Sequence, residues 1–408
     1  MIHKGGRKLK SEKIQKVYKI IMLVVLTAVI TFMITSLIMY KVMGENNIRY
    51  VTVSEDTSSI TKTLTYLKNF IEKHYIGTMD EQKMVEEAIK GYVKGIGDEY
   101  SEYIAASEMK EYMEDTKGKY VGIGVYIAND TKNNRIVVLM PMEGSPAQVA
   151  GLKTGDIISK VNDVEYKGDQ LTEATNNMKG EEGTKVKLEI IREEEILEIE
   201  VERKSIKVNH VESKVLDNQI GYIKISSFDD ETAEEFKTKY EELENKKIKS
   251  LIIDLRNNGG GIVEEATDIA DMMVDKGKTL LITSSKNENE EITKAEKDKI
   301  IQVPVVVLVN ENSASASEIL AAALKESDNA KIVGQKTYGK GIIQTIYTLS
   351  DGSGLKLTTN EYFTPNHNVI NKVGITPDEE VSLPEGKSIY NIEEKEDTQL
   401  QKAIELLK

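Results

Sequence analysis

The pattern of hydrophobic and polar positions changes several times along the chain. Residues 20–40 form an apolar run without a charged side chain, which predicts one long helix. Residues 61–117 carry apolar side chains at three-to-five spacing, which is typical of amphipathic helices. From residue 120 short β-rich runs alternate with turns. Residues 184–203 alternate apolar and charged positions around the sequence REEE, which predicts a two-stranded hairpin.

From residue 211 onward, predicted strands and helices alternate. IGYIKI, SLIIDLR and VPVVVLV read as strands, each followed by a segment with helical periodicity, and the C-terminal stretch predicts a terminal helix. This order is typical of an α/β fold with a largely parallel, helix-covered sheet. SLIIDLR is apolar on both faces, so we expect it near the centre of that sheet.

These changes divide the chain into five expected parts. They are a basic tail (1–19), a transmembrane anchor (20–40), a helical N-terminal segment (45–117), a compact β-rich domain (118–208) and an α/β domain with a C-terminal helical tail (209–408).

The charge is distributed unevenly. The 408 residues carry a net charge of −14, but residues 1–19 hold seven Lys or Arg and one Glu, so the rest of the chain is strongly acidic. An acidic body argues against nucleic acid as a partner. The apolar run would span about 31 Å as a helix, enough for a bilayer core. The basic flank predicts a cytoplasmic N-terminus and an extracytoplasmic body.

Two other interpretations of the apolar run remain open. It could be the core of a cleaved signal peptide, although it is long for one and no small-x-small cleavage site follows. A buried helix of a soluble protein fits less well, because the run is free of charge over its whole length.

The residue types present restrict the chemistry. The chain has no Cys, which excludes thiolate metal sites and cysteine nucleophiles, and its four His are scattered. We therefore expect no metal and no cofactor. A Ser–Lys pair needs neither a cysteine nor clustered histidines, so it is the simplest nucleophile and base that this composition offers. A Ser–His–Asp triad would have to recruit a distant histidine such as His210 or His367.

Residues 310–324, NENSASASEILAAAL, follow a predicted strand and run into a helix. A serine at such a junction exposes its hydroxyl beside the free amides of the first helical turn, which could stabilise an oxyanion. The alternative is that the serine caps the helix, because the S-x-x-E spacing makes a capping box.

Two further segments are candidates for chemistry. If residues 340–345 of GQKTYGKGIIQT (334–345) form a strand, Lys340 and Gln344 project from the same face. The glutamine could then orient the amine of a basic lysine. The simpler interpretation is a solvated lysine at a Gly-rich turn. In DLRNNGGG (254–261), the main chain of three glycines could approach a substrate closely. The alternative is that this segment only forms the turn between a strand and a helix. A phosphate loop is disfavoured because no GK[ST] follows.

Taken together and in order, eight motifs resemble the C-terminal processing peptidases, also called tail-specific proteases, over residues 60–384. The motifs are GIGDEYSEYI, GIGV, GSPAQVAGLKTGDII, GYIKISSF, DLRNNGGG, SASASEILAAAL, TYGKGIIQ and GLKLTTNEYFTPN. The resemblance implies a crotonase-like α/β serine peptidase core with an inserted PDZ domain.

The resemblance also implies roles for single residues. The nucleophile would be Ser315, with Ser313 and Ser317 as local rivals, and the general base would be Lys340, supported by Gln344, with Lys336 as a nearby decoy. The oxyanion would be held by the amides of Gly260 and Ala316. Gly261 is an alternative donor, because this chain has Gly259 where the family turn usually has Pro.

In the β-rich domain, the resemblance implies that the G-I-G-V loop receives the terminal carboxylate of a peptide through backbone amides, while the peptide adds as a strand. The loop consists of Gly122, Ile123, Gly124 and Val125. Arg192 is a candidate for assisting it.

The resulting expectation is a membrane-anchored serine endopeptidase. It would bind the free C-termini of proteins or peptides through its PDZ domain and cleave near them through a Ser–Lys acyl-enzyme mechanism. The resemblance also makes a homodimer possible, formed through the helical segment and the tail helix, because relatives dimerise in that way. The alternatives are a non-catalytic PDZ scaffold at the membrane and, less well supported, a crotonase-like acyl-transfer enzyme.

Overall fold

The computed structural model describes residues 22, 26–27, 30–35, 49–50, 59–116, 119–286, 289–328 and 330–408. The basic tail lies outside the described residues, and so does most of the expected anchor at 20–40. The anchor residues that are described are helical and exposed. Among the described residues, no helix is long and apolar enough to cross a membrane. The chain divides into two compact units, Met1–Ala106 with Thr345–Leu357, and Ser107–Gln344 with Thr358–Lys408.

The first unit contains two of the expected helices, α2 (Ser59–His74) and α3 (Glu81–Lys94). Asp80 caps α3, because its side chain accepts the N–H of Lys83 at 3.0 Å. Two short strands that the sequence pattern did not predict complete this unit. They are β1 (Arg49–Tyr50), parallel to residues 347–348, and β2 (Glu102–Ile104), antiparallel to residues 354–356.

The β-rich domain of the second unit follows α4 (Ala106–Thr116). Its elements are β3 (Lys119–Gly122), β4 (Val125–Asp130), β5 (Arg135–Pro141), α5 (Pro146–Val149), β6 (Ile157–Val161), β7 (Val164–Glu165), α6 (Leu171–Met178), β8 (Lys185–Arg192), β9 (Glu195–Glu202) and β10 (Lys204–Lys207).

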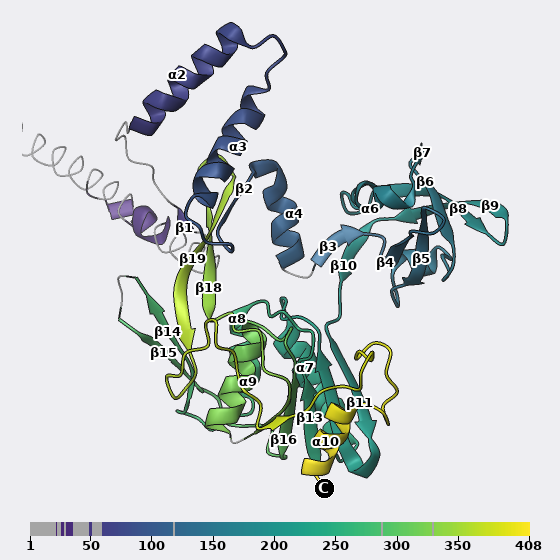
Figure 1. Cartoon of the computed structure of the whole chain (residues 1–408), viewed down its shortest axis with the longest axis vertical. Helices are drawn as coiled ribbons and strands as arrows, with labels where there is room; N and C mark the ends of the chain where they lie inside the picture. Colours follow the sequence, from purple (N-terminus) through teal and green to yellow (C-terminus); the bar gives the residue numbers. More distant parts are fainter. Residues whose placement is uncertain are drawn as a thin grey trace, which may run out of the picture. The chain divides into compact units, whose positions relative to one another are not determined.

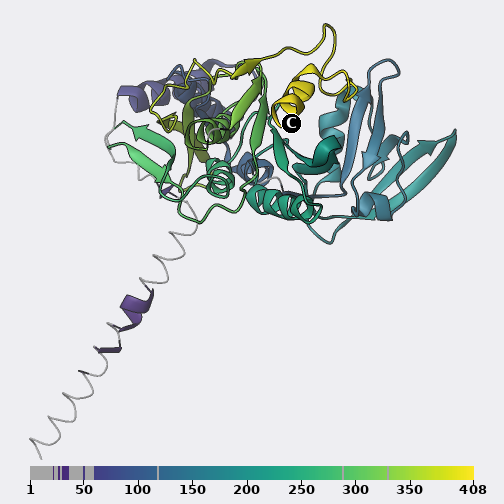
Figure 2. The same cartoon turned by 90° about the horizontal axis from the view of Figure 1, so that it is seen from below.

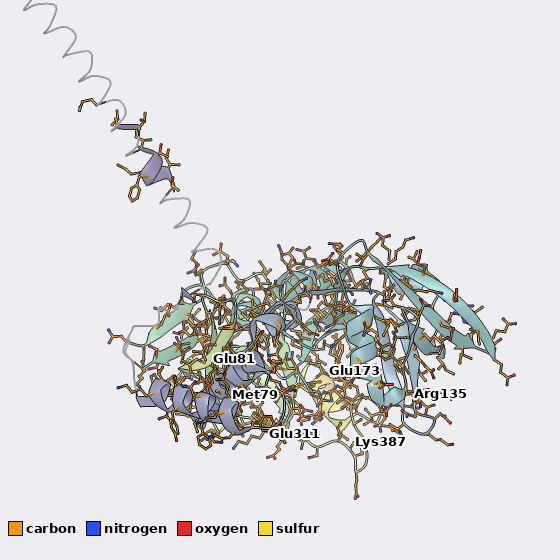
Figure 3. All side chains as sticks on the ribbon, turned by 90° about the horizontal axis from the view of Figure 1, so that it is seen from above. Met79, Glu81, Arg135, Glu173, Glu311 and Lys387 are labelled. Carbon is orange, nitrogen blue, oxygen red and sulfur yellow. The ribbon has the colours of Figure 1, made fainter. Side chains whose placement is uncertain are left out.

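The main sheet of this domain has the order β4-β5-β6-β8-β9. The predicted hairpin is confirmed as β8 and β9, joined by Glu193 and Glu194 with φ of 49° and 72°. Two successive positive φ values are typical of the tight turn whose twist matches the strands. The core lies under the sheet, whereas charged side chains such as Arg135 and Glu173 are exposed (Figure 3).

The α/β part contains the remaining elements. They are β11 (Val211–Leu216), β12 (Ile220–Ile225), α7 (Thr232–Asn245), β13 (Ser250–Asp254), α8 (Val263–Asp271), β14 (Thr279–Ser285), β15 (Glu291–Lys294), β16 (Val305–Val309), α9 (Ala316–Ser327), β17 (Lys331–Gly334), β18 (Ile342–Thr348), β19 (Gly354–Phe363), β20 (Glu379–Glu380) and α10 (Thr398–Leu406).

The central sheet has the order β11-β12-β13-β16-β17-β20, and all its pairs except β11–β12 are parallel. The predicted parallel sheet is confirmed, with the first five residues of SLIIDLR as the interior strand β13. Leu251 and Ile253 face a core shared with α7, α8 and α9, whereas Ile252 faces a second core shared with α10. The helices thus cover both faces of the sheet (Figure 1, Figure 2). Each such fully buried side chain contributes about 1.5–3 kcal/mol.

This sheet brings two of the candidate segments together. Strands β13 and β16 are parallel neighbours, so the loops that follow them leave the same edge of the sheet. One loop is the Gly-rich turn after Asp254, and the other leads through residues 310–315 into α9. A separate antiparallel pairing of β14 with β19 places Tyr362 opposite Thr283.

Candidate active site

Ser315 is the residue before the first turn of α9, and its backbone is unusual. Its φ of 55° and ψ of −117° are rare for a residue with a side chain, and such a conformation costs about 1–3 kcal/mol. The capping interpretation is also realised in part, because the N–H of Ser315 donates to Oε2 of Glu318 at 2.9 Å. Ser315 therefore lies at the helix cap in a strained backbone conformation that the surrounding contacts maintain.

The two rival serines are both fully buried and bonded to the neighbouring turn. The hydroxyl of Ser313 donates to the carbonyl of Leu255 at 2.8 Å, and that of Ser317 donates to the carbonyl of Asn258 at 3.0 Å. These bonds fix the α9 loop against the Gly-rich turn, and both hydroxyls are engaged in them.

The Gly-rich turn lies directly against Ser315. A Cβ atom on Gly260 would stand 2.7 Å from Cβ of Ser315 and 3.0 Å from the nitrogen of Ala316, and Gly260 has a φ of 103°. Only glycine fits such a position. The structure thus brings Gly260, Ser315 and Ala316 together. The N–H of Gly260 donates to Oδ1 of Asn258 at 2.8 Å.

Lys340 lies between two glycines in the loop that leads to β18. We predicted that the strand would begin near Lys340, but it begins at Ile342. The reason is a turn closed by the N–H of Lys372, which donates to the carbonyl of Gly339 at 2.7 Å. Lys340 is half-buried, whereas the decoy Lys336 is exposed.

Glu318 connects the loop before α9 (the serine loop, 310–315) to the loop before β18 (the lysine loop, 335–341). The sequence pattern predicts only a capping role for it. Its Oε2 accepts the N–H of Ser315 and the N–H of Lys340, each at 2.9 Å. Its Oε1 accepts the hydroxyl of Thr337 at 2.5 Å and the N–H of Gly339 at 2.7 Å. The carboxylate is fully buried and satisfied by four donors, as a buried charge requires.

Gln344 lies in β18, as predicted, and is half-buried. Its side-chain nitrogen donates to the hydroxyl of Thr358 on β19 at 3.2 Å. This contact anchors the side-chain amide of Gln344 against β19.

The two histidines considered for a triad have other partners. The ring of His210 contacts Asp229 at 2.6 Å and Ser226 at 3.1 Å, and the ring of His367 contacts Glu290 at 2.8 Å. Within the part of the chain that the structure describes, no group of three or more His, Asp or Glu side chains could hold a metal ion.

Comparison with known proteins identifies the family. Residues 219–381 match the family model of Peptidase family S41, and residues 120–202 match that of the PDZ domain. The chain is 40% identical over 316 residues to the carboxy-terminal processing protease CtpA of Bacillus subtilis strain 168, covering 77% of this chain and 67% of that protein. The chain belongs to the C-terminal processing peptidases of family S41. It is therefore a serine peptidase.

Two further similarities concern the sequence and the fold. The peptidase is 36% identical over 369 residues to a "Probable CtpA-like serine protease" of Staphylococcus aureus strain COL, covering 90% of this chain and 72% of that protein. A solved S41 protease structure from Bacteroides fragilis NCTC 9343 superposes with a TM-score of 0.52 at 15% identity, covering 88% of this chain and 98% of that one. The latter similarity concerns the fold alone.

In the PDZ domain of the peptidase, the Gly122–Val125 loop is held by its carbonyl groups. The carbonyl of Ile123 accepts the N–H of Ala147 at 2.8 Å, and that of Gly124 accepts the N–H of Met142 at 3.0 Å. Gly124 has a φ of 71° and no space for a Cβ atom, because Cβ of Ser145 would be 2.5 Å away. These contacts fix the loop in one conformation.

Arg192, the residue considered for assisting that loop, is engaged within the domain. Its guanidinium makes a bidentate pair with Asp156, with both distances 2.7 Å, and donates to the carbonyl of Gly151 at 2.8 Å. Burial raises the pKa of Asp156, but hydrogen bonds from Arg192 and from the N–H of Lys153 lower it, and the net shift is downward.

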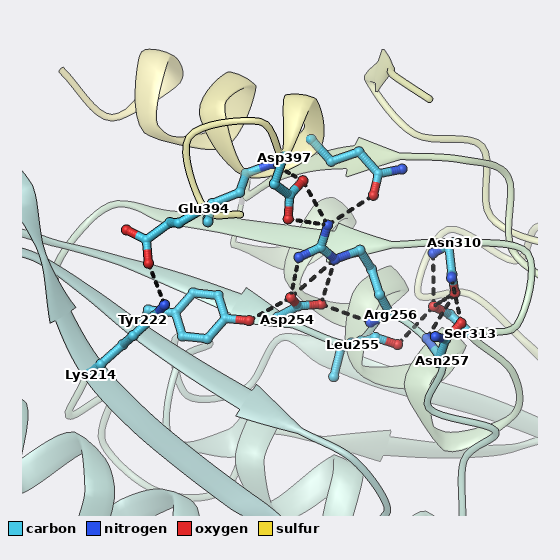
Figure 4. Close-up of polar contacts among 12 residues, drawn as sticks. Lys214, Tyr222, Asp254, Leu255, Arg256, Asn257, Asn310, Ser313, Glu394 and Asp397 are labelled. Carbon is cyan, nitrogen blue, oxygen red and sulfur yellow. Dashed lines mark hydrogen bonds and ion pairs between the residues drawn. The ribbon is translucent and has the colours of Figure 1, made fainter. Parts of the chain in front are cut away.

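A buried ionic network lies at the start of the Gly-rich turn of the peptidase (Figure 4). Arg256 pairs with Asp254 at 2.6 Å and with Asp397 at 2.9 Å, and it donates to Gln399 at 3.0 Å. Burial lowers the pKa of the guanidinium, but Asp254 and Asp397 raise it, and the net shift is upward. The network ties β13 to the C-terminal helix α10, a connection that the sequence pattern did not indicate.

Proposed function

We propose that this chain is a membrane-anchored C-terminal processing peptidase in which Ser315 is the nucleophile and Lys340 is the general base. The observation that carries the proposal is the shared acceptor Oε2 of Glu318, which receives the main-chain N–H of both residues at 2.9 Å. The main-chain nitrogens of two residues 25 positions apart thereby meet at one oxygen atom, which supports a shared site. Gln344 would orient the amine of Lys340.

The reaction follows from these roles. The neutral amine of Lys340 takes the proton of the Ser315 hydroxyl as Oγ attacks the scissile carbonyl. The amides of Gly260 and Ala316 hold the developing oxyanion, and losing one such donor would cost about 3 kcal/mol. Lys340 then protonates the leaving amine, and water hydrolyses the acyl-enzyme. Because the amine must be neutral, activity rises with pH.

The oxyanion donors require a local rearrangement. The N–H of Gly260 is engaged with Oδ1 of Asn258 at 2.8 Å, so it must leave this acceptor before it can donate to substrate. Gly261 is the alternative donor on the same turn. The conformation described here is therefore a resting one in this proposal, and substrate binding would exchange one acceptor for the other.

The PDZ loop Gly122–Val125 would bind the free C-terminus of a protein or peptide substrate and present the preceding residues for cleavage. The anchor proposal rests on the apolar run at 20–40 and its basic flank. The large apolar side chains described in this segment, including Phe32 and Met33, are exposed. The N-terminus would be cytoplasmic and the catalytic body extracytoplasmic.

A homodimer is part of the same proposal. Helix α2 carries exposed apolar side chains along one stripe, among them Ile60, Leu64 and Leu67. A second copy of the helix could cover this stripe.

The decisive experiment compares the full chain in membranes with its Ser315→Ala and Lys340→Ala variants on β-casein, a protein without a stable fold. Both substitutions should abolish cleavage, and both proteins should remain folded by circular dichroism. Wild-type turnover by Ser315→Ala would contradict the assignment. C-terminal peptide binding by the wild type without cleavage under any condition would instead support the non-catalytic scaffold. Protease accessibility of tags at the two ends would test the orientation.

A further inference from the structure

Tyr362 lies at the end of β19 and reaches the lysine loop with both its main chain and its side chain. Its N–H donates to the carbonyl of Gly341 at 3.0 Å, and its phenol hydroxyl donates to the carbonyl of Lys340. The residue is fully buried. Its backbone is fixed from the other side, because Tyr362 pairs with Thr283 of β14.

Both main-chain polar groups of Lys340, its N–H and its carbonyl, are therefore hydrogen-bonded. Its N–H is bound by the buried carboxylate of Glu318, and its carbonyl is bound by the buried phenol of Tyr362. The glycines on either side would otherwise let this segment rotate. Of the two groups, Glu318 fixes the position of the lysine relative to the serine loop, and Tyr362 fixes the direction in which its peptide faces.

The surroundings of the phenol shift its pKa. Burial raises the pKa of Tyr362 well above its usual value and the Glu318 carboxylate raises it further, while a hydrogen bond with Ser315 acts in the opposite direction. The net shift is upward and favours the neutral phenol. Its one proton is donated to the carbonyl of Lys340.

We propose that Tyr362 is a positioning residue of the peptidase, which acts through Lys340 by fixing its carbonyl and aligns its amine with the Ser315 hydroxyl. The inference rests on the proposed roles of Ser315 and Lys340. Tyr362 neither gains nor loses a proton over the cycle: the serine proton passes to the amine of Lys340 and then to the leaving group. Its contribution is to the chemical step, not to substrate binding, because it is fully buried.

The test uses the full chain with Tyr362→Phe, which removes a single oxygen atom. We expect kcat on β-casein to fall about 10- to 100-fold, the range that misplacement of a catalytic group produces. KM should stay within about twofold, and the rate of labelling of Ser315 by a fluorophosphonate reagent should fall in parallel with kcat. Tyr240→Phe in α7 is the matched control, because it removes the hydroxyl of another buried tyrosine, and it should leave both rates unchanged.

A purely structural role would give a different result. It would lower the melting temperature of Tyr362→Phe while the folded fraction retained the wild-type kcat and labelling rate, and this outcome would overturn the inference. Replacement of Tyr362 by 4-aminophenylalanine restores an N–H donor and should recover part of kcat. No recovery by a folded protein would also count against the inference.

The two proposals fail separately. If Ser315→Ala retains activity, the proposed function is wrong whatever Tyr362 does. If Ser315→Ala is inactive and Tyr362→Phe has wild-type kcat, the dyad stands and only the role of Tyr362 is refuted.

Discussion

The carboxylate of Glu318 accepts the main-chain N–H of Lys340 at 2.9 Å, although 22 positions separate the two residues in sequence. The same oxygen accepts the N–H of Ser315, at the cap of the helix that carries Glu318. One buried side chain therefore sets the relative positions of two loops, and its loss should affect chemistry and stability together.

Glu318→Gln tests this link. A glutamine presents one oxygen and one NH2 group to four donors, so at least one donor loses its acceptor at a cost of about 1–3 kcal/mol. We expect kcat to fall about 10- to 100-fold and the melting temperature to fall with it. Steady-state kinetics and thermal unfolding measure the two effects. Glu264→Gln, in the exposed first turn of α8, is the control and should change neither. A Glu318→Gln enzyme with wild-type kcat would show that the two loops are held by other contacts.

Neighbouring glycines of the Gly-rich turn should respond in opposite ways to alanine. A Cβ atom at Gly260 would be 2.7 Å from Cβ of Ser315 and 2.8 Å from the carbonyl oxygen of Ala314, whereas one at Gly259 would meet nothing within 4 Å. Gly260→Ala should therefore be inactive and destabilised. Gly259→Ala should remain active and should gain up to about 1 kcal/mol, because alanine restricts the unfolded chain.

Cleavage assays and denaturant unfolding of the two variants check this pair. Each variant controls for the other, since both add one methyl group to the same turn. Equal activity of the two would mean that the turn does not lie against Ser315 in the working enzyme.

The ion pair between Arg256 and Asp397 joins the base of the Gly-rich turn to the C-terminal helix. Asp397→Ala should destabilise the fold by about 3–5 kcal/mol, because it leaves a buried guanidinium incompletely compensated. It also removes the cap of α10, since Asp397 accepts the N–H of Leu400 at 3.0 Å. Urea unfolding measures the loss.

Glu396→Ala is the matched control for this substitution. Glu396 is the preceding residue and makes an exposed ion pair with Lys387, so its loss should change stability by less than about 1 kcal/mol. If both variants lost the same free energy of unfolding, the Arg256 network would stabilise the fold no more than a surface ion pair does.

The sequence predicted those features of the site that depend on local pattern. The parallel order of the strands, the interior place of β13 and the junction at Ser315 follow from apolar runs and from the turn signals between them. The four-donor role of Glu318 could not be predicted, because the S-x-x-E spacing indicates only a helix cap and says nothing of Thr337 or Lys340. The pairing of Arg256 with Asp397 joins residues 141 positions apart and follows from the docking of α10. The start of β18 was misplaced because the turn at Gly339 is closed by the distant Lys372.

Acid stability of the PDZ domain should depend on the pair between Arg192 and Asp156. The pKa of Asp156 is lower in the folded domain than its usual value near 4, chiefly because hydrogen bonds from Arg192 and Lys153 outweigh the effect of burial. A carboxyl group with a lowered pKa contributes stability that is fully present above its unfolded pKa. That contribution is lost as the pH falls through the folded pKa. Arg192→Met removes the main partner and raises the folded pKa, so acid unfolding should begin at a higher pH.

Circular dichroism of the full chain along a pH titration from about 7 to 2 detects this shift, in the range where carboxyl groups titrate. The control is Arg135→Met, because Arg135 pairs with Asp130 at 3.2 Å on an exposed edge of the same domain. The pKa of Asp130 is lowered first by a hydrogen bond from Asn133, which this control leaves in place. Arg135→Met should therefore move the acid transition little. An equal shift of the acid transition in both variants would show that the buried Arg192 pair contributes no more to acid stability than the exposed Arg135 pair. An unchanged transition in Arg192→Met would refute the linkage.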